Sequence, residues 1–339
     1  MRFSTRLLLP LFLLLLLVGA YTLYWWRVAQ RLGPAVALWA QKERAQMIDA
    51  SWRKMEVTGY PFFFRVNLEG AVLRDRAITP SARLELPLLS ARAWPWNLAE
   101  WQFSAPKGLA ALPFGSGTPG LSAASARGTL SLAASGGGSL SLRLEKAGAA
   151  RVVAEEAAVR IALPQKTPRK EGAQAFSLAV RLKEMKLPFA PAGLGGTIAK
   201  LSFAITVKGN VAPGPIVRMA KAWRAEGGTI ALDHLRLGWG ALGANGSGTL
   251  ALDSELQPEG AFSGTIEGYD AVVAALVASG RMRREAGGLA RIALRLLSKM
   301  GPDGKREIAT SLTIEHGEIS LGPAKLGRLP RLSWSLGTR

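Results

Sequence analysis

The first strong pattern in the chain is an uninterrupted apolar stretch near its N-terminus. Leu7–Trp26 covers 20 residues without a charged side chain, and an α-helix needs about 20 such residues to cross the hydrocarbon core of a bilayer. Arg2 and Arg6 precede the stretch and Arg27 follows it. Tyrosine and tryptophan gather at its distal end, as they do at a membrane–water interface. The pattern therefore predicts a membrane anchor within residues 1–30, with its spanning helix at 7–26.

A cleaved signal peptide is the competing interpretation of the same stretch. Val18, Gly19 and Ala20 are small enough for a cleavage site after a leucine-rich segment. Because the apolar run continues past this point into Tyr-Trp-Trp, an uncleaved signal anchor is favoured. In both interpretations we expect the rest of the chain to be exported, although the arginines on both flanks support the orientation only in part.

Downstream of the anchor, the apolar positions take a helical spacing. From Pro34 to Met55 they lie near one stripe of a helix, and charged residues lie elsewhere. This predicts a connecting helix within residues 31–56. We expect the helix to dock on the domain that follows or to lie on the membrane surface.

At Val57 the helical spacing gives way to alternation of apolar and polar residues, which is typical of strands. A motif of the form Gly-x-Leu/Ile-x-Leu then recurs, with two aliphatic residues pointing the same way, and its copies begin at Gly128, Gly138, Gly228, Gly248 and Gly317. The predicted fold is mostly β (α+β). It has an N-terminal transmembrane helix followed by a large curved antiparallel sheet with a few packed helices. The β-rich domain is expected to span residues 57–334.

Ten alternating apolar positions form a predicted ligand groove on this sheet. They are Phe62, Phe64, Val66, Leu68, Ile230, Leu232, Leu250, Leu252, Ile319 and Leu321. An apolar sheet face must be covered by other elements or occupied by a ligand, because its exposure to water costs about 25 cal/mol per Å².

Three shorter helices are predicted to interrupt the strands. Helical spacing and glycine stops place them at Pro215–Glu226, Ala271–Arg284 and Leu289–Met300. The last two form a helical hairpin that covers the apolar face or plugs one end of the sheet. A basic run flanked by Pro164 and containing Pro168 predicts a linker between two β-rich halves near residues 165–172, and a single continuous sheet fits the pattern equally well. The tryptophans around Pro95 are expected to wedge a corner of the core.

A Gly-x-Gly-x-x-Gly motif at Gly238, Gly240 and Gly243 raises the possibility of a nucleotide-binding loop. Such a loop must follow a strand and open a helix, whose N-terminal amides hold the phosphates. Here a strand precedes the glycines, and the residues that follow, Thr249–Asp253, read as another strand. The motif is therefore interpreted as a turn between strands.

Composition and charge exclude several classes of function. The chain contains no cysteine, so disulfides, thiolate metal sites and cysteine nucleophiles are excluded. His234 and His316 are the only histidines and do not have metal-ligand spacing. No Gly-x-Ser-x-Gly elbow is present. We therefore assign no catalytic, cofactor-binding or metal-ligating residue and expect no cofactor and no enzyme. An envelope hydrolase with a site assembled from scattered residues is kept as a third interpretation.

The formal net charge of +19 attracts anionic partners. The basic residues are scattered along the chain, and no recognition helix, RNP motif or zinc-finger spacing is present. This favours attraction to a membrane surface over binding to nucleic acid.

Four stretches of the chain resemble a known family. They are GYPFFFRVNLEG, ARAWPWNLAEWQFSAP, the segment from Gly227 to Asp270, and EISLGPAKLGRLPRL. Together they are similar to the uncharacterised proteobacterial envelope family called domain of unknown function 2125. The resemblance covers most of Val57–Leu332 and implies no activity, so no site residue is carried over. The strand pattern also resembles AsmA-type envelope proteins, whose sheets form apolar grooves for lipid.

These observations lead to a functional expectation with one alternative. We expect a non-enzymatic protein, single-pass in the bacterial inner membrane with most of the chain in the periplasm, that binds or conveys lipid or another hydrophobic ligand along its apolar sheet. Cleavage of the signal would leave a periplasmic protein instead. The alternative is an envelope scaffold or assembly protein with a closed core and protein partners.

Overall fold

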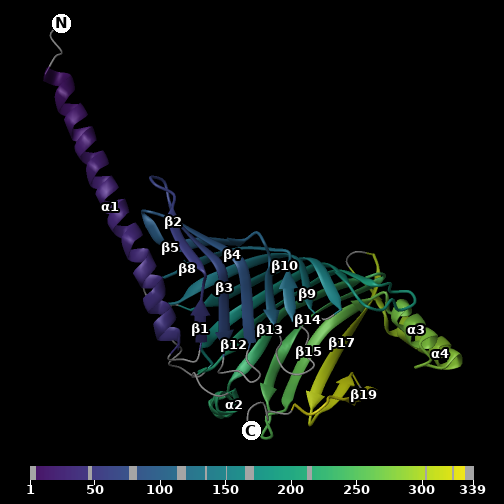
Figure 1. The fold of residues 1–339 in the computed structure, drawn as a ribbon. Coiled ribbons are helices and arrows are strands. Elements are labelled where there is room, and N and C mark those ends of the chain that lie inside the picture. Colours follow the sequence, from purple (N-terminus) through teal and green to yellow (C-terminus); the bar gives the residue numbers. More distant parts are fainter. Residues whose placement is uncertain are drawn as a thin grey trace.

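The computed structural model describes residues 5–44, 48–75, 82–112, 120–133, 136–149, 151–164, 172–211, 216–301, 304–322 and 324–332. Its first element, α1 (Thr5–Arg44), is a helix of 40 residues that lies along one side of a large curved sheet and extends beyond it (Figure 1). The helix is long and apolar enough to cross a membrane, and its most apolar window is not buried by the rest of the chain.

The predicted connecting helix at 31–56 is wrong in its second half. α1 continues without a break to Arg44, and the chain then enters strands β1 (Ile48–Ser51) and β2 (Lys54–Thr58). In β2 the side chains alternate between exposed and half-buried, which is the period of a strand. Both strands pair with β3 (Phe64–Asp75), so backbone pairing at this edge outweighs the weak helical pattern.

The described residues contain nineteen strands in one antiparallel sheet. After the first three, the strands are β4 (Ala82–Trp94), β5 (Asn97–Ala105), β6 (Leu109–Leu112), β7 (Leu121–Ala123), β8 (Ser125–Leu132), β9 (Gly138–Ala149), β10 (Val152–Leu163), β11 (Gln174–Lys186), β12 (Thr197–Lys208), β13 (Thr229–Trp239), β14 (Leu242–Leu252), β15 (Pro258–Glu267), β16 (Lys299–Met300), β17 (Arg306–Glu315), β18 (Glu318–Leu321) and β19 (Ala324–Arg328).

The long strands follow one another across the sheet nearly in chain order. From β8 to β15 each strand pairs with the next one along the chain, and β17, β18 and β19 continue the series. At the other end, β5 pairs with β4 and β8, while the short β6 and β7 pair beside them. The prediction of a mostly β fold with a large antiparallel sheet is confirmed.

The predicted linker at 165–172 lies almost entirely outside the described residues. β10 and β11, on either side of it, pair directly through nine pairs of residues from Val153↔Lys186 to Ala162↔Ser177. The sheet is therefore continuous across this point.

A compact core exists only near the first strands. Ala71, Leu86, Ala105 and Ala126 are buried together, and seven partly buried side chains surround them: Trp52, Leu68, Leu84, Leu89, Leu109, Leu142 and Leu144. Across β11–β18, by contrast, the only described strand side chains that are buried are Ile198 and Val207, near the two ends of β12. Most of the sheet is thus a single layer.

The shorter helices lie at the margins of the sheet and do not cover it (Figure 1). They are α2 (Ile216–Ala225), close to its predicted range, α3 (Tyr269–Ala278) and α4 (Arg284–Leu297). The predicted boundary between the last two helices is wrong: α3 ends at Ala278, and the glycines Gly287 and Gly288 lie inside α4, where Gly287 allows close packing against Val277 of α3. α2 is fastened at one end of the strands, where the Trp223 indole donates a 2.8 Å hydrogen bond to the carbonyl of Lys208. α3 and α4 form the predicted hairpin beside the far ends of β14 and β17.

Two glycine patterns in the sequence have different structural explanations. Gly240 lies in the tight turn between β13 and β14 with φ 55°, and a Cβ there would lie 2.6 Å from the carbonyl oxygen of Leu194. The turn interpretation of the Gly-x-Gly-x-x-Gly motif is confirmed. The recurrent motif glycines Gly128 and Gly248 instead lie inside strands, each under the ring of a cross-strand phenylalanine, Phe103 and Phe262.

Candidate functional site

The strand register brings the alternating aliphatic residues into continuous rows on one face of the sheet, here called the apolar face. Residues that are directly opposite on neighbouring strands share a face. One row contains Leu144, Ala157, Leu182, Leu201, Leu237, Ala244, Ile266 and Ile308. A second contains Leu140, Ile161, Leu178, Ile205, Leu232, Gly248, Phe262, Leu312 and Leu321.

The six predicted groove residues in the C-terminal half all lie on the apolar face. Leu232 and Leu321 belong to the second row. A third row, two residues further along each strand, contains Ile230, Leu250 and Ile319. Leu252 is two residues beyond Leu250 on the same strand and pairs with Pro258. The described side chains of this set are half-buried. Their role in ligand binding stays a prediction.

The four predicted groove residues near the first hairpin do not form an open groove. Phe62 lies in the turn before β3 and is 67% exposed, so it is not on the sheet face at all. Phe64 is fully buried and Val66 is nearly so. Leu68 packs against the compact core. Alternation predicted the direction of the last three side chains, but it did not reveal that α1 and the neighbouring strands already cover them.

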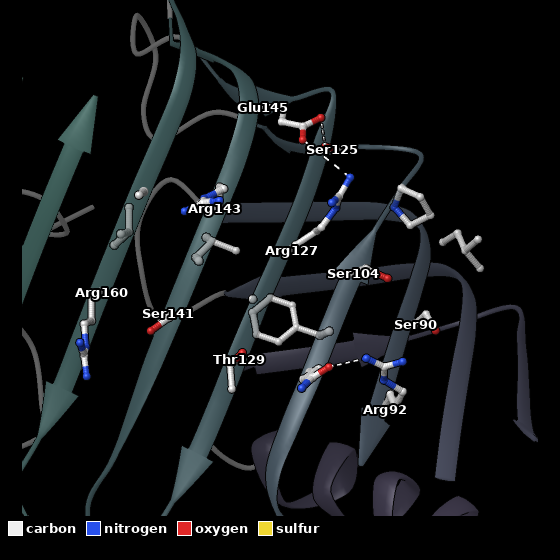
Figure 2. A pocket seen from close by; sticks show the side chains of 18 of the residues that line it. Ser90, Arg92, Ser104, Ser125, Arg127, Thr129, Ser141, Arg143, Glu145 and Arg160 are labelled. Atoms are coloured by element: carbon white, nitrogen blue, oxygen red, sulfur yellow. Dashed lines mark hydrogen bonds and ion pairs between the residues drawn. The ribbon is translucent and has the colours of Figure 1, made fainter. Parts of the chain in front are cut away.

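The opposite face of the sheet contains a hollow of about 1000 Å³ that extends from β3 to β11. Serine and threonine side chains line it together with six arginines and a single glutamate. The charged residues are Arg65, Arg92, Arg127, Arg143, Arg160, Arg181 and Glu145. Figure 2 shows four of these arginines and Glu145 on adjacent strands around the hollow. Register explains the gathering, because Arg65 is opposite Arg92, Arg127 is opposite Arg143, and Arg181 is opposite Ala158 beside them.

Only part of the positive charge in this basic hollow is neutralised. The Glu145 carboxylate accepts a 2.7 Å hydrogen bond from Ser125 and lies 3.7 Å from Arg127. Arg143 lies 3.5 Å from Glu156. Arg160 and Arg181 form no ion pair with any residue in the described ranges, so the hollow retains excess positive charge.

The mouth of the basic hollow is bordered by further charge and by an aromatic ring. Lys183 donates a 3.0 Å hydrogen bond to Glu156, and this bond holds the pKa of that carboxyl below its usual range. The Arg65 guanidinium lies 4.8 Å from the centre of the Phe63 ring, and that of Arg92 lies 5.9 Å from it. Local sequence patterns did not predict this convergence, although the recurrence of arginine in six strands was its visible signal.

Two loop tips contact α1 where its apolar part ends. The hydroxyl of Tyr21 donates to the carbonyl of Pro61, and that of Tyr24 donates to the carbonyl of Pro95 at 2.7 Å. Between these contacts, the ring of Trp25 stacks on Phe64 and meets Tyr60 edge-on, both with centroids 5.3 Å apart. The sheet is thus fastened to the helix at the level of the predicted aromatic belt.

Exposed aromatic side chains surround this junction and form what is here called the aromatic collar. It consists of Tyr24, Trp26, Tyr60, Phe62, Trp94 and Trp96, all exposed. Trp94 and Trp96 stack on each other with centroids 5.1 Å apart and are not packed into the protein. The prediction that they wedge a corner of the core is therefore wrong. Amphipathic aromatic rings are enriched at the headgroup level of bilayers, so the collar is suited to that interface.

The two histidines are not brought together. His234 is half-buried in β13, opposite Ala204, and His316 lies in the turn between β17 and β18, beside a smaller hollow of about 570 Å³. Among the described residues, no group of three or more His, Asp or Glu side chains could hold a metal ion.

These features define a class of β-sheet protein with an N-terminal helix that is long and apolar enough to cross a membrane. Its other marks are a single-layer antiparallel sheet and an aromatic collar where helix and sheet meet. The sequence places the chain within that class. Residues 25–330 match the model of DUF2125, a family of uncharacterized proteins conserved in bacteria, and the chain belongs to this family. No curated protein matches the sequence, and the likeness to AsmA-type proteins is not shown.

Proposed function

We propose that the protein is a non-enzymatic lipid- or hydrophobe-binding protein, anchored in the bacterial inner membrane by α1 with its sheet in the periplasm. One observation carries this proposal. Across β11–β18 the apolar face is continuous, yet Val207, at the end of β12 beside α2, is the only described side chain of this face that is buried. Apolar surface left open to water costs about 25 cal/mol per Å², so an apolar occupant stabilises the protein.

The dimensions and chemistry of the apolar face favour acyl chains. The rows cross eight strands from β9 to β17, and seven spacings of about 4.8 Å make them roughly 34 Å wide. Apart from Phe262, the residues of these rows are aliphatic or glycine, and hydrophobic contact is not directional. Such a surface holds a long flexible hydrocarbon better than a compact polar molecule.

The placement of the membrane follows from α1 and the aromatic collar. The collar surrounds the distal end of the apolar stretch, so the sheet would begin at the membrane surface, where lipid is available. We propose that the anchor is retained. Intact mass measurement of the membrane-extracted protein tests this: a mass starting at Met1 is expected, and a mass starting after Ala20 would show cleavage.

The absence of enzymatic activity is also a proposal, supported by the composition of the basic hollow. The polar groups there are arginines, which stay protonated at neutral pH, hydroxyls, and the amides of Asn67 and Gln102. Its one carboxylate, Glu145, is held by Ser125 and Arg127. A base next to a nucleophile is the arrangement expected of a hydrolase. The hydroxyl–carboxylate contact in the described part of the hollow, from Ser125 to Glu145, is exposed to solvent, and no histidine is among the described residues that line the hollow.

Native mass spectrometry of the full chain in nanodiscs, with a matched pair of variants, tests the lipid proposal. Leu250 and Thr249 are neighbours in β14, with Leu250 on the apolar face and Thr249 on the other. We expect lipid bound to the wild-type sheet, a marked decrease for Leu250→Asp, and no change for Thr249→Asp. A spectrum without lipid at stoichiometric sensitivity, or an equal decrease in both variants, would overturn the proposal.

The basic hollow favours a second candidate, an envelope scaffold that binds an acidic protein partner. Six arginines against one glutamate complement an acidic segment. Replacement of Arg160 and Arg181 by alanine separates the two candidates. If the scaffold role is correct, these replacements abolish partner capture and leave bound lipid unchanged.

A further inference from the structure

The hairpin of α3 and α4 has an apolar stripe without a partner. Leu289, Ile292 and Leu296 follow the i, i+3, i+7 spacing of one helix face, and their exposed fractions lie between 61% for Ile292 and 82% for Leu296. Leu297 and Met300 extend the patch and are each 68% exposed. These are among the most exposed large apolar side chains outside α1. The expectation that this hairpin covers the sheet or plugs its end does not account for them.

The exposure of the stripe does not result from a loosely attached helix, because other sides of α4 are in contact with α3 and β17. Gly287 is buried against α3, and a Cβ there would lie 2.6 Å from Val277. At the end of α4, the Arg306 guanidinium of β17 donates to the carbonyl of Arg295 at 3.2 Å and to the Ser298 hydroxyl at 3.0 Å. The fold therefore holds α4 in place and presents its stripe outward.

Positive charge accompanies the stripe. Gly280–Met300 contains five arginines, one lysine and one glutamate. Arg284, Arg291 and Arg295 lie on one flank, roughly 110° around the helix from the apolar stripe at 100° per residue. A helix with an apolar side and a cationic flank lies in the headgroup region of anionic bilayers, with its apolar residues in the acyl boundary.

The membrane that holds α1 is out of reach of this surface. From β3, which contacts α1, to β17, which contacts α4, there are eleven inter-strand steps, or roughly 50 Å along the sheet at about 4.8 Å per step. Figure 1 places α3 and α4 at the opposite end of the molecule from α1, whose apolar part extends away from them.

We propose that the exposed side of α4 docks on a second lipid bilayer with anionic headgroups, facing the bilayer that anchors α1. This inference is independent of whether the apolar sheet face carries a ligand, because it concerns a different surface and a different readout. If both hold, the sheet joins two lipid surfaces.

The test uses the full chain with its own anchor already occupied. The protein is placed in nanodiscs of phosphatidylcholine and mixed with vesicles of phosphatidylcholine and phosphatidylglycerol in equal parts, and flotation measures how many nanodiscs the vesicles capture. We expect capture by wild type and at least about a ten-fold loss for the double variant Leu289→Asp, Leu296→Asp, which removes two buried leucines from the bilayer contact.

Matched variants keep the result interpretable. Leu132 and Leu163 are exposed leucines at strand ends, and the control Leu132→Asp, Leu163→Asp is expected to be captured as wild type. The charge variant Arg291→Glu, Arg295→Glu is expected to lose capture while retaining the leucines. Circular dichroism checks that the sheet is retained in each variant.

Three outcomes would overturn the proposal. The first is capture that is unchanged by the Leu289 and Leu296 substitutions, and the second is equal loss in the leucine control. The third is α4-dependent pairing of nanodiscs in the absence of vesicles, which would identify a second copy of the chain as the occupant.

Discussion

Trp25 of α1 stacks on Phe64 of β3 with ring centroids 5.3 Å apart and planes inclined by 21°. Phe64 is the largest side chain in the described residues that is fully buried. The best-packed contact of a mostly single-layered molecule thus joins the apolar N-terminal helix to the sheet. The domain is fixed to its anchor and does not hang from a flexible linker.

Replacement of Phe64 by alanine should destabilise the protein by about 3–5 kcal/mol, because a large buried ring is lost and its cavity cannot collapse fully. Chemical unfolding of the full chain in detergent, followed by circular dichroism, measures the change. Phe62→Ala, two residues away and exposed, is the control and should alter the free energy of unfolding by less than about 0.5 kcal/mol. Similar losses in both variants would contradict the packing described here.

The aromatic collar should lie at the headgroup level. Because the chain has no cysteine, a single cysteine at Trp96 or Phe62 can carry an environment-sensitive dye. In proteoliposomes we expect blue-shifted emission at both positions. A dye on His316→Cys should report water, since this exposed residue lies in the turn after β17, eleven strand steps from β3. Emission typical of water at all three positions would place the collar outside the membrane.

The glycines under aromatic rings should not tolerate a side chain. In Gly248→Ala the new Cβ would lie 2.4 Å from the Phe262 ring, so the ring must move, at a cost of about 1–3 kcal/mol. Gly238→Ala is the matched control in the neighbouring strand, where the nearest atom is 4.0 Å from the added Cβ. Thermal unfolding should therefore separate the two variants, and a lower melting temperature for Gly238→Ala than for Gly248→Ala would refute this explanation.

The last hairpin should depend on pH through Glu318. Hydrogen bonds from Lys325 at 2.8 Å and Arg328 at 3.1 Å hold the pKa of Glu318 below its ordinary value of 4.5. A carboxyl whose pKa is lowered by folding stabilises the fold above its ordinary pKa, and this contribution is lost as the pH falls through the lowered value. Since these groups are exposed, the effect should be small.

Amide exchange of β18 and β19 in wild type and in Glu318→Gln, compared at the same pH, measures this contribution. Wild type should be better protected at pH 7, and the difference should disappear in acid. A difference that persists unchanged well below pH 4 would exclude the carboxylate as its source.

The sequence predicted those features that depend on side-chain direction within one segment. Alternation placed Ile230, Leu232 and Leu250 on one face because successive residues of any strand point to opposite sides. A 20-residue apolar run was sufficient to identify a helix long and apolar enough to cross a membrane, but residues 48–56 were wrongly assigned to a helix, because the strand at Ile48 is specified by its partner β3.

Features that depend on the register between distant strands could not be predicted. Arg65 and Arg181 line the same hollow because of seven strands in fixed alignment, and no local pattern specifies that alignment. The same holds for Phe64, whose burial requires Trp25 from another element. The stripe on α4 was visible as a helical period, but its exposure depends on where α3 and β17 hold the helix.

The order of the strands has a consequence for how the molecule is made. From β9 onward nearly every strand pairs with its immediate predecessor, so the sheet can form hairpin by hairpin as the polypeptide emerges, beginning beside the N-terminal helix. The addition of strands also ends at a defined edge. β18 and β19 have only four and five residues, and Lys325 and Arg328 lie on the final edge. Short, cationic borders resist the addition of a further strand, which protects a long open sheet from polymerising with its neighbours.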